Sequence, residues 1–455
     1  MIKNPIYWQW GLLIAFGIFF FFIAPYSKKR EQFFAAVTDK GKQPGFWMLT
    51  GSLVISWIFA KSITNAANLG LSFGMVGGVA YAVYYLSFIV AGIIIYRLRT
   101  KGGFTSIHHF LQTRFGIYAV GIFSILIGFR LFNEVWSNTM VIGSYFGDPG
   151  TKSYYLAILV FTVLTLAYVI KGGLRSSLLT DAIQMVFFGV LLVLLLGVIL
   201  PKNEAGVMDY VRSGTWKMDS GLNLVFAALL QVFSYPFHDP VLTDRGFISP
   251  PKTTLKSYMW AAVIGVVCMI LFSFVGIYAR FEGLEGQAPV AVGKTLGTGV
   301  MLAMNFIMIT SAASTLDSSF TSFSKLMVID LGKGLSHSLT KGRWMMILLA
   351  VGGTLPVFAG PEVLSATTVS GTMVMGLAPV FLLCHLKAPK ISFYLSTGLG
   401  VLVGIIQVLG YFPEQLIWTT GKYADLLWAN AWGLLACFMV YLAPVIFNYG
   451  KEKSN

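Results

Sequence analysis

The sequence predicts an all-helical protein that crosses a membrane many times and forms a single domain, residues 1–455. Three observations indicate this class. Of the 455 residues, 56% are hydrophobic and only 11% are charged, whereas soluble chains carry about 25% charged residues. The mean hydropathy is +0.76, so a polar shell cannot cover the apolar side chains. Long apolar stretches also recur along the whole chain.

A transmembrane helix needs about 20 mostly apolar residues, and thirteen stretches of this chain are candidates. In order, they cover about residues 7–24, 44–70, 73–97, 117–146, 154–170, 176–200, 222–240, 258–280, 297–330, 344–360, 363–386, 391–412 and 426–449.

The first stretch, residues 7–24, is followed by a basic flank of Lys28, Lys29 and Arg30 and lacks a small-residue cleavage site. A secretory signal peptide instead carries its basic residues in front and is cleaved. We therefore expect an uncleaved first helix with the N-terminus outside the cell. If the sides then alternate, thirteen helices leave the C-terminus in the cytoplasm.

The positions of the basic residues agree with this topology. It places 21 of the 32 Lys and Arg residues in cytoplasmic segments, Arg245 among them, with 8 outside and 3 within the membrane. Cytoplasmic loops of membrane proteins carry such an excess. The asymmetry accounts for the net charge of +14 without a nucleic-acid partner. We expect the protein to lie in the lipid bilayer of the plasma (inner) membrane.

The second stretch is unusually polar in its middle, where Ser62, Thr64, Asn65 and Asn68 occur. Helices broken at mid-membrane expose carbonyl groups and helix ends that bind ions and substrates. We interpret the second stretch as such a broken helix. The alternative is that these side chains only bond to neighbouring helices.

The ninth stretch is rich in hydroxyl groups. Residues 310–325 include nine Ser or Thr side chains and one carboxylate in sixteen positions. Four of the hydroxyl residues recur at helical spacing on one face, namely Ser311, Ser314, Thr315 and Ser318. Hard cations prefer oxygen ligands, so this face suits sodium. Helix packing through hydroxyl groups is the alternative.

The segment Lys171 to Met185 joins the fifth stretch to the sixth and continues into the sixth. It resembles the signature of the sodium:solute symporter family. The matching residues are Gly172, Gly173, Leu174, Thr180, Asp181 and Gln184. The resemblance implies a LeuT-type fold whose core consists of two inverted five-helix repeats, residues 44–200 and 222–386. The first helix (7–24) and the last two (391–449) would be peripheral.

The resemblance also implies a sodium site between the broken helix and the ninth stretch. In this chain, the backbone carbonyls of Ile55 and Ile58 would bind the ion together with three residues of the ninth stretch, Ser311, Ser314 and Thr315.

Some members of the family have a second sodium site, whose positions match Asp181, Asp317 and Ser318. Asp317 stands where those members have a serine, so two carboxylates would lie close together. Both cannot ionise cheaply without a cation. Either a second sodium ion binds between them or one of them holds a proton. Lys325 could also pair with Asp181 or with Asp330.

By family position, Ser62, Tyr81, Tyr84 and Asp239 line the solute pocket. Lys61 replaces a residue that is often polar or acidic in sugar-transporting members. Together with Asp239, it indicates a charged or zwitterionic solute.

Two further pairs each have two interpretations. Arg130 and Glu134 are one helical turn apart, so they form a neutral buried pair, or Arg130 binds a substrate carboxylate as a similarly placed arginine does in the sialic acid members. His238 and Asp239 lie between two prolines. They form either a protonatable gate for the solute or a structural pair at the helix end.

The sequence therefore predicts a carrier that couples a small organic solute to the coupling ion sodium and moves both into the cell by alternating access. The alternatives are a proton-coupled or sodium-independent carrier of the same fold and, less well supported, a membrane sensor derived from a carrier. No nucleophile elbow, phosphate-binding loop or histidine-rich metal cluster occurs in the sequence, so we do not expect an enzyme.

Overall fold

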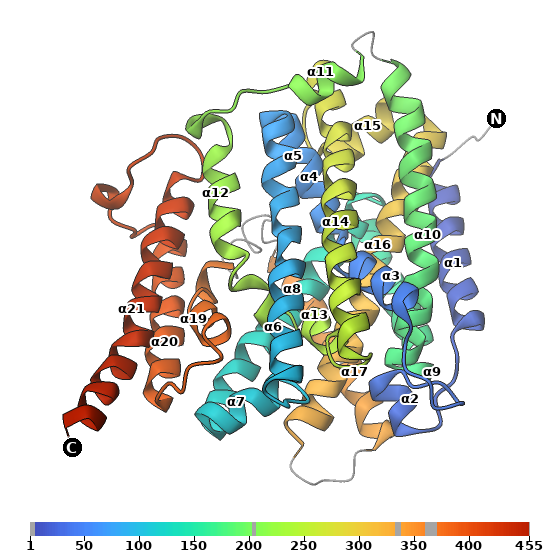
Figure 1. The fold of residues 1–455 in the computed structure, drawn as a ribbon. Coiled ribbons are helices and arrows are strands. Elements are labelled where there is room, and N and C mark those ends of the chain that lie inside the picture. The colour runs from blue at the N-terminus through green and yellow to red at the C-terminus, as the bar shows by residue number, and fades with distance from the viewer. Residues whose placement is uncertain (1–4, 203–205, 333–337, 360–370, 455) are drawn as a thin grey trace.

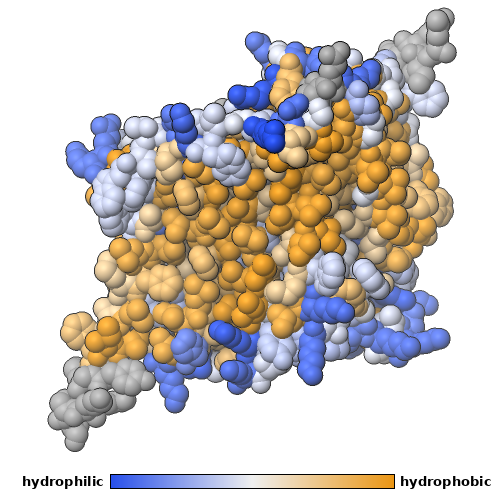
Figure 2. Space-filling view, turned by 45° about the horizontal axis from the view of Figure 1, so that its top comes forward, coloured by the Kyte–Doolittle hydropathy of each residue, from blue (hydrophilic) through white to orange (hydrophobic). Residues whose placement is uncertain are grey.

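The computed structural model describes residues 5–202, 206–332, 338–359 and 371–454. Every regular element in these ranges is a helix. Most of the long helices lie roughly along one common axis, up or down in Figure 1. A broad hydrophobic band crosses the face seen in Figure 2, with hydrophilic side chains gathered at its two ends. The predicted class, an all-helical membrane protein, is therefore confirmed.

Nine helical stretches in the described ranges are long and apolar enough to cross a membrane, and a bent pair makes a tenth. The nine agree with nine of the predicted stretches. They are α1 (Pro5–Ile23), α5 and α6 (Met75–Ala82 and Ser87–Thr100) joined by η1 (Val83–Leu86), α8 (Ile117–Ser144), α9 (Lys152–Gly172), α10 (Leu174–Ile199) continued by η2 (Leu200–Lys202), α14 (Pro251–Phe281), α16 (Thr298–Lys325) continued by the π-helical η5 (Leu326–Asp330), α20 (Lys390–Val408) and α21 (Ala424–Ser454).

The second predicted stretch is a broken helix. It consists of α3 (Phe46–Trp57) and α4 (Ala60–Phe73), which meet at an angle of 60°. Ile58 leaves the helical conformation at φ −79° and ψ 73°, and Phe59 is extended at φ −63° and ψ 149°. The backbone therefore turns at mid-span without a proline.

The seventh predicted stretch is also interrupted. It consists of α12 (Leu222–Gln231), the 3-10 turn η4 (Tyr235–His238) and α13 (Pro240–Arg245). Pro236 and Pro240 each stand at the start of a helical segment, where the missing N–H costs nothing.

The tenth and eleventh predicted stretches do not form long apolar helices in the described ranges. The tenth is α17 (Leu339–Thr354), followed by η6 (Leu355–Ala359). Of the eleventh, residues 363–370 lie outside the described residues; in the rest, residues 371–373 are helical and α19 (Leu377–Leu382) follows. The remaining short helices connect the spans and are α2 (Arg30–Ala35), α7 (Ile107–Phe115), α11 (Val207–Arg212), η3 (Met218–Ser220), α15 (Ala288–Thr295) and η7 (Glu414–Leu416).

Small residues let the central helices approach closely. A Cβ atom on Gly276 of α14 would lie 1.7 Å from the carbonyl oxygen of Ala67 of α4, and one on Gly70 would lie 2.4 Å from that of Ser273. Helix α16 packs against α10, α8 and α17, and α10 packs against α3. The break between α3 and α4 therefore faces the hydroxyl-rich helix α16, which also contacts both halves.

The turn between α9 and α10 depends on glycine. Gly173 closes α9 and starts α10 with φ +59°, a left-handed conformation that favours glycine. A side chain there would also meet Phe33. The Gly-Gly pair of the signature thus fixes the start of the helix that carries Asp181.

Candidate functional site

The break in the second span meets the hydroxyl face of α16. The hydroxyl group of Ser311 contacts the carbonyl oxygen of Ile58, and both residues are buried. Thr315 lies one turn further and donates to the carbonyl of Ser311 at 3.0 Å. Ile55 is buried on the last turn of α3. The structure thus brings Ser311 and Ile58 together, whereas the Thr315 hydroxyl bonds within its own helix.

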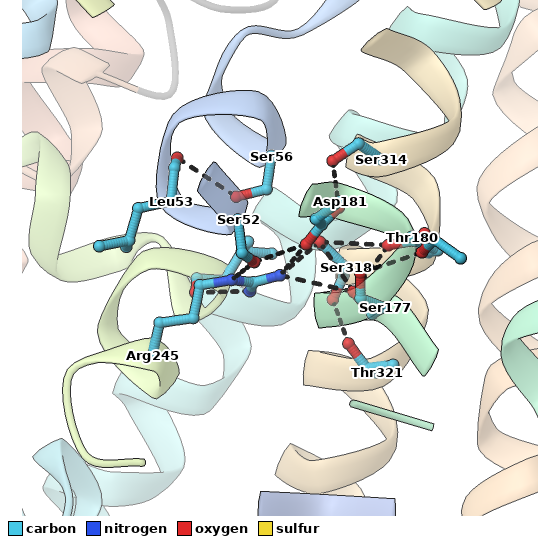
Figure 3. Close-up of polar contacts among 12 residues, drawn as sticks. Ser52, Leu53, Ser56, Ser177, Thr180, Asp181, Arg245, Ser314, Ser318 and Thr321 are labelled. Carbon is cyan, nitrogen blue, oxygen red and sulfur yellow. Dashed lines mark hydrogen bonds and ion pairs between the residues drawn. The ribbon is translucent and has the colours of Figure 1, made fainter. Parts of the chain in front are cut away.

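Ser314 of the same helix is turned towards another group. Asp181 is fully buried on α10 and accepts hydrogen bonds from Ser314 and, at 2.5 Å, from Ser52 of α3. Its carboxylate also forms an ion pair with Arg245 of α13, with 3.0 Å between Oδ2 and Nη2. Figure 3 shows Ser52, Ser314 and Arg245 converging on Asp181.

Arg245 joins three other helices. Its Nε donates to Ser52 at 2.7 Å and its Nη2 to Ser318 at 2.6 Å, and its side chain is 0% exposed. The topology expected from the sequence placed Arg245 in a cytoplasmic segment, and this was wrong, because Arg245 is buried inside the bundle. Its charge offsets that of Asp181, which would be costly to bury alone.

Asp317 lies beside this pair but has other partners. Its carboxylate accepts hydrogen bonds from Ser177 at 2.7 Å, Tyr168 at 2.8 Å and Thr180 at 3.0 Å. Ser318 contacts both Asp317 and Arg245, so the two carboxylates belong to one polar cluster. The predicted proximity of Asp181, Asp317 and Ser318 is thus present.

The charges of this cluster are unequal. It contains two carboxylates, Asp181 and Asp317, and one guanidinium, Arg245, all buried. Hydroxyl groups partly stabilise a buried carboxylate but do not neutralise it. One monovalent cation, either sodium or a proton, would balance the remaining negative charge. The surrounding donor atoms are oxygens of Ser, Thr and Tyr, which fit a hard cation.

Lys325 takes no part in this cluster. Its ammonium group lies 2.7 Å from Asp244 and 2.9 Å from Asp330. Of the two partners considered from the sequence, Asp330 is present and Asp181 is not.

Four charged residues named from the sequence form a second buried cluster. Glu134 pairs with Lys61 at 2.8 Å and also with Arg130. Arg130 in turn lies 3.2 Å from Asp239, which accepts a hydrogen bond from the indole of Trp57 at 2.8 Å. Two positive and two negative charges therefore neutralise each other, and neither Lys61 nor Asp239 lacks a protein partner.

A small cavity lies next to this charged cluster. It is lined by Trp57, Phe59, Ser62, Tyr81, Tyr84, Tyr85 and Tyr235. Tyr81 donates to Ser62 at 3.0 Å, and Tyr84 donates to Gln231 of α12 at 2.9 Å. Three predicted substrate residues, Ser62, Tyr81 and Tyr84, thus lie in its wall.

Lys61 and Arg130 lie behind this aromatic wall rather than in it. Their charged groups stand 5.1 and 5.3 Å from the centre of the Phe59 ring. The cationic groups therefore act on the cavity through the ring and not by direct contact.

His238 and Asp239 do not bond to each other among the described contacts. The Nδ1 atom of His238 lies 2.5 Å from the carbonyl of Tyr235. Asp239 caps α13 by accepting from the backbone N–H of Leu242 at 3.2 Å. The pair suggested by their adjacency in the sequence is thus replaced by two separate sets of partners.

Several residues of both clusters were not identified from the sequence. Ser52 and Ser177 are serines within mostly apolar helices, and Trp57 and Tyr235 resemble ordinary packing residues. Arg245 had a usable signal, because the run from Val241 to Ile248 contains the acid–base pair Asp244–Arg245 directly after a proline-bounded break. The contacts of Arg245 with Asp181 and Ser52 join residues 64 and 193 positions apart. Spacing along the chain does not predict such contacts.

Comparisons with known proteins agree with the resemblance found in the sequence. No family model matches the chain. Sodium/glucose cotransporter 1 of Oryctolagus cuniculus is 26% identical over 195 residues, covering 39% of this chain and 29% of that protein. The urea active transporter of Saccharomyces cerevisiae is 21% identical over 484 residues, covering 91% of this chain and 65% of that protein. The chain thus spans less than two thirds of the length of these relatives.

Solved structures agree over nearly the whole chain. A substrate-bound, outward-open Na+-coupled sialic acid symporter superposes with a TM-score of 0.71 at 14% identity, covering 96% of this chain and 98% of that one. Mhp1, a nucleobase-cation-symport-1 family transporter, in a closed conformation gives 0.57 at 12% identity, covering 91% and 94%. In sequence, the chain therefore resembles sodium:solute symporters, and its fold is of the LeuT type.

Proposed function

We propose that this protein is a sodium-coupled symporter that brings a small organic solute into the cell by alternating access. The proposal includes thirteen membrane spans, with residues 44–200 and 222–386 as the two inverted repeats. It also includes an outside N-terminus and a cytoplasmic C-terminus in the plasma (inner) membrane. The relatives named as sodium/glucose cotransporters and the distribution of Lys and Arg support it.

The observation that carries the proposal is the contact between the broken second span and α16. The break frees carbonyl groups around Ile58, and the hydroxyl of Ser311 touches one of them. We infer that the sodium ion binds there, with Ile55, Ser314 and Thr315 as further ligands. Rotation of Ser314 away from Asp181 would bring its hydroxyl towards the ion.

The coupling follows from this geometry. An ion that holds α3, α4 and α16 together fixes the break, and the break forms one wall of the aromatic cavity through Trp57 and Phe59. Solute then binds to a wall that is already ordered, and by linkage solute strengthens sodium binding by the same factor. Each inward sodium charge contributes about 2.3 kcal/mol per 100 mV of membrane potential.

The solute contacts Ser62 and the hydroxyl groups of Tyr81 and Tyr84 in this proposal. The sequence-based expectation of a charged or zwitterionic solute depended on Lys61 and Asp239. Because both have protein partners of opposite charge, we infer a small polar solute without a net charge. Lys61, Arg130, His238 and Asp239 then hold the shape of the cavity from behind.

Removing the Ser311 hydroxyl tests the proposal. We expect Ser311→Ala to need at least about tenfold more sodium than the wild type for half-maximal thermal stabilisation, because a ligand at the break is lost, a change of about 1.4 kcal/mol. The measurement is the melting temperature of purified protein titrated with NaCl against choline chloride, repeated with a solute library that includes urea, monosaccharides and amino acids.

Thr310→Ala is the matched control, since it removes a neighbouring hydroxyl from a different face of α16. It should keep the wild-type sodium dependence. An unchanged sodium dependence in Ser311→Ala, with both variants equally stable, would mean that sodium does not bind at this break.

A proton-coupled carrier is the second candidate, and the unbalanced charge on Asp317 favours it. Here Asp317 would carry the coupling proton instead of lying beside a second sodium ion at Asp181 and Ser318. Solute counterflow in proteoliposomes with and without sodium, at several pH values, separates the two candidates. Counterflow that does not need sodium but depends on pH would support the proton-coupled carrier.

A further inference from the structure

A second cavity, which shares no lining residue with the aromatic cavity, lies where α6, α7 and the segment after α19 meet. It has a volume of about 540 Å³. Its lining consists of Arg97, Leu98, Lys101, Gly102, Phe104, Arg114, Cys384 and His385. Cavities of this size hold small-molecule ligands or a headgroup, and nothing in the transport mechanism uses it.

The cavity is cationic, and no contact among the described residues neutralises its charges. Among the described contacts, the side chains of Arg97, Lys101 and Arg114 have no hydrogen-bond or ion-pair partner. Arg99, between two of them, differs because it bonds to the carbonyl of Gly246 at 2.7 Å.

The segments that line the cavity supply no counter-charge of their own. Residues 40–133 and 363–413, which include every segment of the lining, contain no Asp or Glu. Three cations thus surround one cavity without a counter-charge from their own segments. Like charges that face one cavity repel one another, and a bound anion would relieve this repulsion.

The helix ends that line the cavity lie towards one end of the molecule. Helix α7 lies near the lower end of the molecule, on the same side as α2 (Figure 1), and hydrophilic side chains border the hydrophobic band there (Figure 2). Leu98 and Phe104 add an apolar wall beside the cations. A ligand here would meet cations and apolar surface together.

We propose that this cavity binds a phosphate-bearing anion, and that the headgroup of an anionic phospholipid is its occupant in the membrane. Arginine forks bind phosphate oxygens in pairs, and the cavity offers two, Arg97 and Arg114, with Lys101 as a third charge. Basic pockets at the cytoplasmic face of membrane proteins bind anionic headgroups in this way. The apolar wall would contact the start of an acyl chain.

Occupancy of the cavity would stabilise the transport core. The Phe110 ring of α7 lies 5.7 Å from that of Phe381 of α19, which stacks on Phe237 at 4.3 Å. Phe237 belongs to η4, the break in the seventh span. A ligand that ties α6, α7 and the segment after α19 together therefore holds the aromatic contacts behind that break.

The test compares lipids and phosphate on the purified full chain. We expect phosphatidylglycerol in mixed micelles to raise the melting temperature more than phosphatidylcholine does, and native mass spectrometry to count the bound lipid. In the double variant Arg97→Gln/Arg114→Gln, the apparent affinity should fall roughly 25-fold, about fivefold for each charge removed. Lys101→Gln alone, on an exposed residue, should weaken binding about fivefold.

Arg30→Gln is the control, because it removes an exposed cation from α2 at the same end of the molecule; it should bind as the wild type does. A separate arm titrates inorganic phosphate against chloride at constant ionic strength. Stabilisation by phosphate that needs Arg97 and Arg114, without a lipid effect, would assign the cavity to a free phosphate compound. Equal binding of either anion by the wild type and the double variant would overturn the proposal.

Discussion

Arg245 shows how a single side chain organises the transport core. It donates to residues of α3, α10 and α16 and to the carbonyl of Val241 in its own helix. Burying a charge is costly unless it is paired and hydrogen-bonded, and Arg245 meets both conditions. Helix α13, which follows the break in the seventh predicted stretch, is thereby connected to three helices through one guanidinium group.

Replacing Asp181 by Asn tests this arrangement. We expect Asp181→Asn to lower stability by about 3–5 kcal/mol, because Arg245 would lose its direct ion-pair partner, and Asp317 bonds to Ser177, Tyr168 and Thr180 instead. The double variant Asp181→Asn/Arg245→Gln should recover part of that loss. Melting temperatures in detergent, combined as a double-mutant cycle, measure the coupling between the two residues.

Asp39→Asn provides the comparison, since Asp39 pairs with Arg175 at the surface, where its side chain is 71% exposed. The Arg175 guanidinium holds the pKa of Asp39 below its usual value, but the pair is screened by water. Its loss should leave the melting temperature nearly unchanged. If Asp181→Asn were as mild as Asp39→Asn, the buried ion pair would not stabilise the core.

At the residue level, the sequence predicted which side chains are functional candidates better than it predicted which residues they contact. The hydroxyl face of α16 follows from helical spacing, so Ser311, Ser314 and Ser318 could be named in advance. The partner of each hydroxyl could not be named, because the contact of Ser314 with Asp181 depends on how α16 packs against α10. The pairing of Lys61 with Glu134 likewise depends on how α4 packs against α8 and not on spacing within either helix.

At the level of elements, the two interrupted spans arise from different causes. The break between α12 and α13 coincides with Pro236 and Pro240 and could be inferred from them. The break between α3 and α4 has no proline, and polar residues after it were the only signal. Close packing of α4 on α14 at Gly70 and Gly276 positions that second half.

A methyl group on Gly276 should disturb this packing. We expect Gly276→Ala to lower stability by about 1–3 kcal/mol or more, because the added Cβ would overlap the carbonyl of Ala67 on α4 and force the helices apart. The sodium dependence of the melting temperature should weaken too, since α4 carries one side of the break.

Gly128→Ala in α8 is the matched control. No atom lies within 4 Å of a Cβ placed there, and alanine favours a helix over glycine by about 1 kcal/mol. The control should be neutral or slightly stabilising. Equal stability of the two variants would show that α4 and α14 are not held together by this close approach.

The single spans were predictable because each is a long apolar run, whereas the end of the tenth stretch was not. Helix α17 ends at Thr354, and the 3-10 turn that follows contains Pro356. Hydropathy is similar on both sides of such a turn, so it does not locate the end of a helix. For the same reason, the boundaries of α12 and α13 follow from structure rather than from composition.

At the level of the whole molecule, the hydrophobic band and the buried charges have one explanation. Charged groups are costly at membrane depth, and these charged side chains lie buried inside the bundle beneath the hydrophobic band. The cluster of Lys61, Arg130, Glu134 and Asp239 is neutral and shapes the cavity. The cluster around Asp181 and Asp317 has one negative charge in excess, and the broken helix beside it faces the same hydroxyl-rich α16.

The central claim is that sodium binds where Ile58 meets Ser311 and orders the break. Hydrogen–deuterium exchange of a peptide covering residues 55–62, in sodium and in choline, tests it most directly. We expect slower exchange in sodium for the wild type and no difference for Ser311→Ala. Exchange at residues 55–62 that is the same in sodium and choline for the wild type would contradict the claim.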